Sequence, residues 1–475
     1  MATVTVIDPV TRIEGHLKVE ITIDSVGGLT QVTDAKCTGT LFRGFETVLA
    51  GRDPRDATVL TQRICGVCPV SHALASTLAL ESAAEFTAPT NARLLRNLVL
   101  GANFLQSHIL HFYLLAAPDY VAAPAGAPWS PAWSVDMRTG LGTVSGHIPT
   151  AVTARRRAHE MGAVFGGRMP APHTYVAGGF TSLPDSASIT KFRSHLTWLT
   201  NFIQNTYIPD VEMVANMYSD FFKIGKGPGN FIAYGVFDQN SSGSSKLLRR
   251  GAVLNSAPTN VADINLNSIT EAINYSWYQD SSAARNPSNG RTVPSYPKTN
   301  AYSWLKAPRY SNRPMEAGPL ARMWINGDYR NGVSVMDRHY ARAQEALKIA
   351  QAMNTWLGQL STSGAVYSTF KVPASGSGTG LTEAARGALG HWVSYTAGKI
   401  ANYQVITPTC WNASPQDGSR VKGPMEQALI GTPIQDESQP IEALRVIHSF
   451  DPCLSCAVHV MRPNGKPVVI RAGLR

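Results

Sequence analysis

The sequence predicts an α+β fold, with a central bundle of long helices, a small N-terminal antiparallel sheet and a peripheral lobe of loops and short strands. Three observations support this prediction. Residues 3–38 alternate apolar and polar side chains, later segments place apolar residues at helical spacing, and two cysteine pairs lie near opposite ends of the 475-residue chain. Because both pairs can serve one site only if the two ends fold together, we expect a single interlocked domain over residues 1–475.

The N-terminal part, residues 1–60, is expected to contain the antiparallel sheet. Apolar and polar residues alternate along residues 4–7 and 17–23. Such alternation places every second side chain on the same face of a strand. The pair Gly27-Gly28 then predicts a tight turn between two strands.

Helical spacing of apolar residues begins after the first cysteine pair. It predicts a helical region over residues 61–237, which contains this pair, and a second helical region over residues 332–459, which contains the other pair. The most apolar stretch, residues 98–117, is interrupted by polar side chains, so we expect a buried helix rather than a membrane span. The predicted helices cover residues 72–85, 91–115, 151–165, 189–218 and 338–360.

Two segments lack helical spacing. Residues 238–331 are rich in Ser, Asn, Gly, Pro and Tyr, and we interpret them as the peripheral lobe. Residues 376–380 are rich in glycine, and we predict a loop there. This segment lacks the full glycine spacing of a dinucleotide-binding turn, so we expect no nucleotide cofactor.

The composition excludes some classes of function. A hydrophobic content of 44% with 16% charged residues is typical of a globular protein. The formal net charge is +10, but basic and aromatic residues form no nucleic-acid-binding motif, so we expect no nucleic acid partner. The first residues show no basic region followed by an apolar core, so we expect no secretory signal in this chain and membrane association only through partners.

Each cysteine pair is followed by a histidine at a short distance. Cys65 and Cys68 precede His72, and a second pair near the other end precedes His459. Thiolates select soft metals such as zinc, copper, nickel or iron. A structural zinc site or a redox dithiol is the usual interpretation of such pairs, but a local zinc module does not join the two ends of a long chain. The two remaining cysteines, Cys37 and Cys410, are interpreted as small buried apolar residues.

The two cysteine motifs resemble those of the large, catalytic subunit of nickel-iron hydrogenases. The motifs are RICGVCPVSH at residues 63–72 and DPCLSCAVH at residues 451–459. The resemblance covers nearly the whole chain and implies a nickel-iron hydrogenase large-subunit-like fold. Residues 105–110 also resemble the selenium-containing branch, although position 453 is cysteine. Further matching segments, in the family's order, are TRIEGH (11–16), FRGFE (42–46), GRDPRD (51–56), RGAL (386–389) and PTCWN (408–412).

The resemblance implies a nickel-iron centre whose iron carries carbon monoxide and two cyanide ligands. Cys65 and Cys453 match the terminal nickel ligands, and Cys68 and Cys456 match the cysteines that bridge nickel and iron. The surrounding residues that it implies are Arg386, Asp451, Pro408 and Thr409 near the iron ligands, and His72 beside a bridging sulfur. The resemblance also implies a catalytic role for Arg386, whose guanidinium overhangs nickel in the family and polarises bound hydrogen.

The same resemblance implies a route for protons and a second metal site. Cys453 is expected to accept the proton when hydrogen is split, and Glu14 to relay it outward. Magnesium, or another divalent ion, is expected to bind Glu46, the main-chain carbonyl of Val405 and His459.

We expect several protein partners. An iron-sulfur cluster needs four ligands, and too few cysteines remain here, so a small subunit must carry the electrons. In most of the family, after maturation proteins insert the metal, an endopeptidase removes the C-terminal tail; here it would cut between His459 and Val460 and release residues 460–475. We expect a periplasmic or membrane-associated location through the small subunit, with a cytoplasmic location as the alternative.

The predicted function is the oxidation of hydrogen to protons and electrons by a respiratory, uptake-type nickel-iron hydrogenase. The alternatives are a hydrogen sensor, a relative without the chemistry such as the related subunit of respiratory complex I, and a structural zinc protein. Two positions depart from the family pattern: Ser107 stands where many members have aspartate, and Ala385 stands where proline is common. We therefore expect one carboxylate fewer around Arg386 than in those family members.

Overall fold

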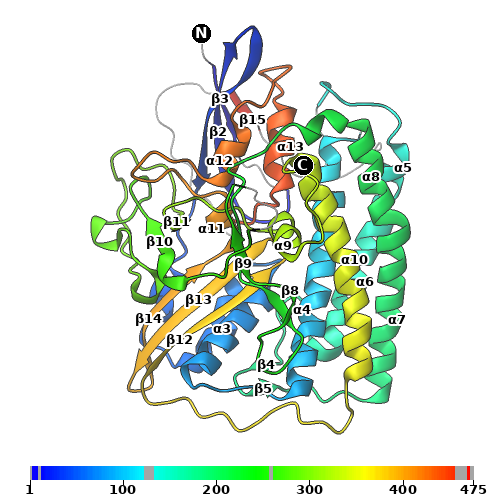
Figure 1. Cartoon of the computed structure of the whole chain (residues 1–475), viewed down its shortest axis with the longest axis vertical. Coiled ribbons are helices and arrows are strands. Elements are labelled where there is room, and N and C mark those ends of the chain that lie inside the picture. Colours follow the sequence, from blue (N-terminus) through cyan, green and yellow to red (C-terminus); the bar gives the residue numbers. More distant parts are fainter. Residues whose placement is uncertain (1–2, 9–11, 122–132, 256–259, 455–467, 471–475) are drawn as a thin grey trace.

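The structure is a computed structural model that describes residues 3–8, 12–121, 133–255, 260–454 and 468–470. A sheet formed near the N-terminus lies at one end, and a second sheet packed on a helix lies beside a bundle of long helices (Figure 1). The N-terminal sheet has the strand order β15-β1-β2-β3. Its strands are β1 (Thr3–Ile7), β2 (Leu17–Val26), β3 (Leu29–Gly39) and β15 (Val468–Ile470).

The N-terminal sheet agrees with the alternation in the sequence. Strand β2 pairs antiparallel with both β1 and β3, and its inward side chains are fully buried from Leu17 to Ile23 at every second position. Gly27 and Gly28 form the predicted turn, with φ of 61° and 86°. Strand β15, in the predicted tail, pairs in parallel with β1.

The helix bundle follows the predicted segments, with bounds that differ by a few residues. A helical stretch over Thr90–Asp119 is long and apolar enough to cross a membrane by composition alone, but 94% of its most apolar window is buried in the protein, so it is a core element. The bundle helices are α4 (Thr90–Leu110), α6 (Ile148–Gly166), α7 (Ser186–Phe202), α8 (Ile208–Met217) and α10 (Val335–Gln359), with π-helical turns at His111–Ala116 and Ile203–Tyr207.

The second sheet corrects two predictions. Residues 376–380 were predicted as a loop and residues 332–459 as helical, but this region contains the antiparallel strands β12 (Gly376–Ala384), β13 (Gly387–Thr396) and β14 (Lys399–Ile406). The glycines are needed because β12 lies directly on helix α3 (Pro69–Ala83). A Cβ atom on Gly378 would lie 2.0 Å from the Ala79 carbonyl oxygen, and one on Gly380 would lie 1.8 Å from that of Ala75.

The remaining elements are short. The described part of the predicted lobe, residues 238–331, contains small strand pairs and helix α9 (Pro319–Asn326), and β10 and β11 lie at one edge of the molecule (Figure 1). Helix α13 (Ile441–Ser449) leads into the second cysteine motif. The other elements are α1 (Phe45–Leu49), α2 (Ala57–Leu60), α5 (Gly142–Gly146), β4 (Tyr175–Val176), β5 (Gly179–Phe180), β6 (Phe231–Ala233), β7 (Val236–Asp238), β8 (Lys246–Leu248), β9 (Gly251–Val253), β10 (Ile269–Ala272), β11 (Ala307–Tyr310), α11 (Pro408–Asn412) and α12 (Pro424–Leu429).

Candidate active site

The structure brings three of the four predicted metal-ligating cysteines together. Cys65 follows a 3₁₀ turn, Cys68 is the residue just before α3, and Cys453 follows α13. The Sγ atom of Cys65 lies 3.3 Å from that of Cys453 and 2.7 Å from that of Cys68. All three sulfurs lie within 4.8 Å of one another, which is close enough for them to bind the same metal ion. Cys456 and His459 lie outside the described residues.

The close packing of the three thiols opposes the ionisation of all of them at once. Burial opposes ionisation of Cys65, but hydrogen bonds from Cys453 and Cys68, together with Arg386, lower its pKa. The pKa of Cys453 is raised by its hydrogen bonds with Cys65 and Cys68 and by burial. The cluster therefore favours a single negative charge, and a bound soft cation would allow every sulfur to be a thiolate.

The TRIEGH segment is tied directly to the second cysteine motif. Gly15 forms a parallel bridge with Leu454, and the His16 N–H donates to the Leu454 carbonyl oxygen at 2.8 Å. Gly15 has φ of 76°, and a Cβ atom there would lie 1.1 Å from the Leu454 oxygen, so only glycine fits. Glu14 is thereby held beside the first motif, where it accepts a hydrogen bond of 3.2 Å from the Gly66 N–H.

Arg386 lies in the turn between β12 and β13 and is buried. Its Nε donates to the Asp451 carbonyl oxygen at 3.1 Å, and its Nη1 donates to Ser107 Oγ at 3.2 Å. Nη2 lies 2.9 Å from Asp451 Oδ1 as an ion pair, yet among the described residues it has no well-aligned hydrogen bond. Burial lowers the pKa of Arg386, but Asp451 and the cysteines outweigh burial and raise it. The guanidinium is thus a cation with donor capacity left over.

A second buried arginine, Arg322, holds the turn that carries Arg386. It donates to both Glu345 oxygens at 2.8 and 2.6 Å and to Glu383 Oε2 at 2.8 Å. It also donates to the carbonyl oxygens of Ala384 and Ala385 at 3.0 and 2.8 Å. The sequence reasoning missed these residues because isolated charged residues on α9, α10 and β12 carry no motif.

Thr409 and Pro408 begin helix α11 next to the cysteines. Pro408 occupies the first helical turn, where its missing N–H costs nothing. The Cys453 N–H donates to Thr409 Oγ1 at 3.1 Å. Since the oxygen of Thr409 accepts this bond, its hydroxyl hydrogen is available to an acceptor in the cavity.

Glu46 and Val405, two of the three residues predicted for a divalent cation, line the same cavity farther along. Glu46 Oε1 accepts a hydrogen bond of 2.9 Å from the Val405 N–H, and Thr292 donates to Glu46 Oε2. Lys306 Nζ lies 3.9 Å from Glu46 Oε2 and 3.4 Å from a Glu271 oxygen. This end of the cavity therefore holds two carboxylates and one ammonium group.

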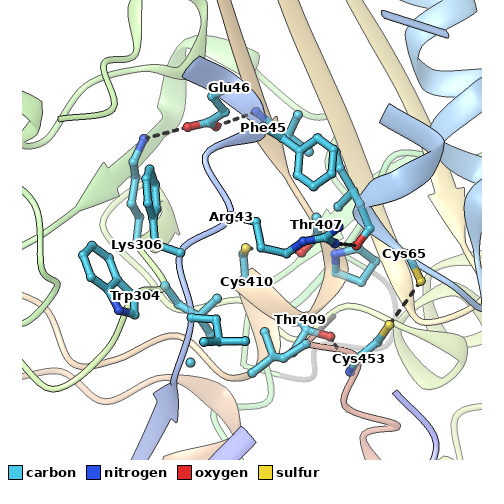
Figure 2. A pocket seen from close by; sticks show the side chains of 18 of the residues that line it. Arg43, Phe45, Glu46, Cys65, Trp304, Lys306, Thr407, Thr409, Cys410 and Cys453 are labelled. Carbon is cyan, nitrogen blue, oxygen red and sulfur yellow. Dashed lines mark hydrogen bonds and ion pairs between the residues drawn. The ribbon is translucent and has the colours of Figure 1, made fainter. Parts of the chain in front are cut away.

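One cavity of about 200 Å³ extends from the three cysteines and Arg386 to Glu46 and Lys306. Figure 2 shows Cys65 and Cys453 at one end, Glu46 and Lys306 at the other, and Cys410 between them. Cys37 is fully buried, as predicted, whereas Cys410 is partly buried: it packs against two apolar clusters, and its sulfur contacts Thr407 Oγ1 at 3.2 Å.

The comparisons with known proteins decide the family. The family described as "Nickel-dependent hydrogenase" matches residues 43–141 and 129–459, and one described as "HoxL-like" matches residues 4–36. The chain belongs to the nickel-dependent hydrogenase family. It is therefore an enzyme with hydrogenase activity and a catalytic large subunit that uses a nickel-iron active site, which confirms the resemblance found in the sequence. A small subunit is its implied partner.

Two relatives and one solved structure illustrate the similarity. The chain is 38% identical to the periplasmic [NiFeSe] hydrogenase large subunit of Desulfomicrobium baculatum, over 96% of this chain and 94% of that one. It is 33% identical to the uptake hydrogenase large subunit of Rhizobium leguminosarum bv. viciae, over 97% of this chain and 96% of that one. The reduced Ni-Fe-Se hydrogenase of D. vulgaris Hildenborough superposes with a TM-score of 0.92 at 39% identity, over 97% of this chain and 100% of that one. These similarities do not favour a hydrogen sensor or a structural zinc protein.

Proposed function

We propose that this large subunit oxidises hydrogen to protons and electrons in a respiratory, uptake-type complex, with Cys65, Cys68, Cys453 and Cys456 as the metal ligands. The observation that carries the proposal is the convergence of three thiols from opposite ends of the chain beneath Arg386. The donor set fits soft metals, because three sulfurs lie close enough to share ions and the cluster favours a neutralising cation. When bound, the nickel-iron centre supplies the electrophilic metal at which hydrogen is cleaved heterolytically.

The cyanide ligands that the resemblance implies are proposed to accept hydrogen bonds from donors above the cysteines. An acceptor in a dry pocket costs about 1–3 kcal/mol if it finds no donor. Among the described residues, Arg386 Nη2 and the hydroxyl hydrogen of Thr409 are donors with unused capacity beside Cys453. We assign them to the cyanide nitrogens, with Pro408 and Asp451 holding these two side chains in place.

Cys453 and Glu14 form the first two stations for the proton. Cys453 lies next to Leu454, which pairs with Gly15, so the residue that follows Glu14 is locked to the residue that follows Cys453. Glu14 is also bonded to Gly66, between the two cysteines of the first motif. A carboxylate held against both motifs is placed to take a proton from the Cys453 sulfur and pass it outward.

Magnesium, or another divalent ion, is proposed at the Glu46 end of the cavity. Glu46 is bonded to the main chain of Val405, and both residues line the cavity. With His459 they would form a set of few protein ligands completed by water, as magnesium prefers.

The partner that carries electrons is proposed to be an iron-sulfur small subunit. Outside the two motifs only Cys37 and Cys410 remain, fewer than the four ligands of a cluster. One relative is named periplasmic and another, from Wolinella succinogenes, quinone-reactive. We place this complex in the periplasm or at a membrane through its partners, with a cytoplasmic location as the alternative.

Maturation is proposed to end with endopeptidase cleavage between His459 and Val460. The segment to be removed, residues 460–475, contains β15, which pairs with β1. Intact mass of the active large subunit checks this step: the expected chain ends at His459, and active enzyme that retains Arg475 would contradict cleavage.

Infrared spectroscopy and metal analysis of the purified complex test the proposal together. We expect nickel and iron in equal amounts, magnesium or another divalent ion, and bands from carbon monoxide and cyanide. One zinc and no nickel would overturn it. Glu14→Gln is expected to keep the bands and to slow exchange between hydrogen and deuterated water strongly. Loss of the bands in this variant would show that Glu14 is structural instead.

A further inference from the structure

Three buried side chains form a hydrogen-bonded chain that ends at the cysteine cavity. His72 Nδ1 lies 3.1 Å from His391 Nε2, and His391 Nδ1 lies 2.8 Å from Tyr403 Oη. All three residues are at most 1% exposed. They come from α3, from β13, which packs against α3, and from β14, which pairs with β13 (Figure 1).

Helical geometry places one end of this chain at the metal-ligating sulfurs. Cys68 is the residue before α3 and His72 lies four residues later, so both face the same side of the helix. His72 lines the cavity together with Cys65 and Cys68. Its Nδ1 is bonded to His391, so Nε2 is the ring nitrogen left for the sulfurs.

Both imidazoles are buried, and burial disfavours the charged form, so the direction of the hydrogen bonds between two neutral rings is a real choice. A neutral imidazole has one N–H donor and one acceptor nitrogen. Two such rings in contact must therefore both point their protons toward the cavity or both point them away from it.

The two ends of the chain select the first arrangement. A metal-bound thiolate can only accept a hydrogen bond, so an unprotonated Nε2 beside it would bring two lone pairs together. A protonated His72 Nε2 requires His72 Nδ1 to accept from His391 Nε2–H, and His391 Nδ1 in turn to accept from the Tyr403 hydroxyl. Burial raises the pKa of Tyr403, so this hydroxyl keeps its proton and can donate.

We infer that Tyr403 and His391 are positioning residues that hold His72 in the tautomer whose Nε2–H points at the metal-ligating sulfurs. The inference rests on the proposed nickel-iron site. An N–H aimed at a sulfur withdraws electron density from it, and through it from the metals. The three side chains polarise the sulfur while remaining uncharged. They therefore avoid the cost of burying a second cation beside Arg386.

The decisive variant is Tyr403→Phe, which removes one oxygen atom at the far end of the chain. Without this donor, His391 and His72 can adopt either tautomer, and the bond to sulfur weakens. A sulfur that donates more charge makes iron more electron-rich. The carbon monoxide band of the purified complex should therefore shift to lower frequency, or split into two bands of which one lies at lower frequency. His391→Gln should produce the same change, and combining it with Tyr403→Phe should add nothing, because Tyr403 acts only through His391.

A matched control is Tyr395→Phe. Tyr395 lies on β13 in the same small core as Tyr403, and its buried hydroxyl has no hydrogen-bond partner among the described residues. Its loss should leave the bands unchanged. If Tyr403→Phe complexes had full nickel and iron content and wild-type bands, the inference would be overturned but the proposed function would stand. If the wild-type complex lacked the bands, the proposed function itself would be overturned. Additive shifts in the double variant would also overturn the inference, since they would indicate two separate packing effects.

Discussion

Two buried arginines meet at the short turn between β12 and β13: Arg322 bonds to the turn and Arg386 belongs to it, and they differ in how completely they are bonded. Arg322 makes five hydrogen bonds, to two carboxylates and two main-chain carbonyl groups. Arg386 keeps one nitrogen without a well-aligned partner among the described residues, and it lines the cavity. Buried polar groups normally have hydrogen-bond partners. The unpartnered nitrogen of Arg386 therefore marks the place where a ligand is expected.

The charges around the two arginines show the same contrast. Burial raises the pKa of Glu383 to about 7, although Arg322 opposes this, while the pKa of Glu345 falls to about 2 because Arg322 and His108 outweigh burial. The Arg322 cluster therefore neutralises itself. Around Arg386 the cation faces Asp451 and three sulfurs, and Ser107 offers only a hydroxyl. We interpret Arg322 as structural and Arg386 as functional.

Arg322→Met should produce the largest effect and should act on stability. It leaves Glu345 and Glu383 buried without their cation, and breaking a buried ion pair on one side costs about 3–5 kcal/mol. The unfolding midpoint of the purified complex should fall sharply. Replacing Glu345 and Glu383 by Leu in the same chain should recover much of the loss. If the triple variant were as unstable as Arg322→Met, the loss would come from the carbonyl contacts instead of the uncompensated charges.

Arg386→Lys should change activity more than stability. Lysine keeps the charge but has no planar fork of donors, so it cannot bond Asp451 and Ser107 and still face the cavity. Loss of one such donor typically lowers kcat by about 10²–10³-fold. Hydrogen oxidation with a dye acceptor measures kcat, and metal content confirms that the centre is assembled. Wild-type kcat with full metal content would place Arg386 in the same structural class as Arg322.

The comparison also shows what the sequence could predict. Alternation in residues 17–23 and helical spacing in the bundle depend only on local periodicity, and both were found without a structure. The cysteine motifs were recognisable because metal ligands need a fixed spacing. The roles of Arg322 and Gly15 depend on which distant backbone lies nearby, and the strand at residues 376–380 depends on the carbonyl oxygens of α3. Contacts of this kind leave no periodic signal in one sequence.

Asp119 extends the comparison to a third buried charge cluster, with the smallest expected effect. It accepts a hydrogen bond of 2.8 Å from Arg12 Nη2 and another from His448 Nδ1. These contacts tie the segment that contains Glu14 to α13, which leads to Asp451. Burial alone would raise the pKa of Asp119, but Arg12 and His448 lower it to about 2.

A depressed carboxyl pKa stabilises the fold above the ordinary value of 3.8, and this stabilisation is lost as the pH falls through about 2. Asp119→Asn should therefore lower the free energy of unfolding by about 2 kcal/mol at neutral pH. The difference from wild type should shrink between pH 4 and pH 2, as thermal unfolding across this range would measure. Asp328→Asn, which breaks a partly exposed ion pair with Lys348, serves as the control and should change little at any pH. A difference for Asp119→Asn that stayed constant down to pH 2 would mean that its cost comes from packing and not from the charge that Arg12 and His448 stabilise.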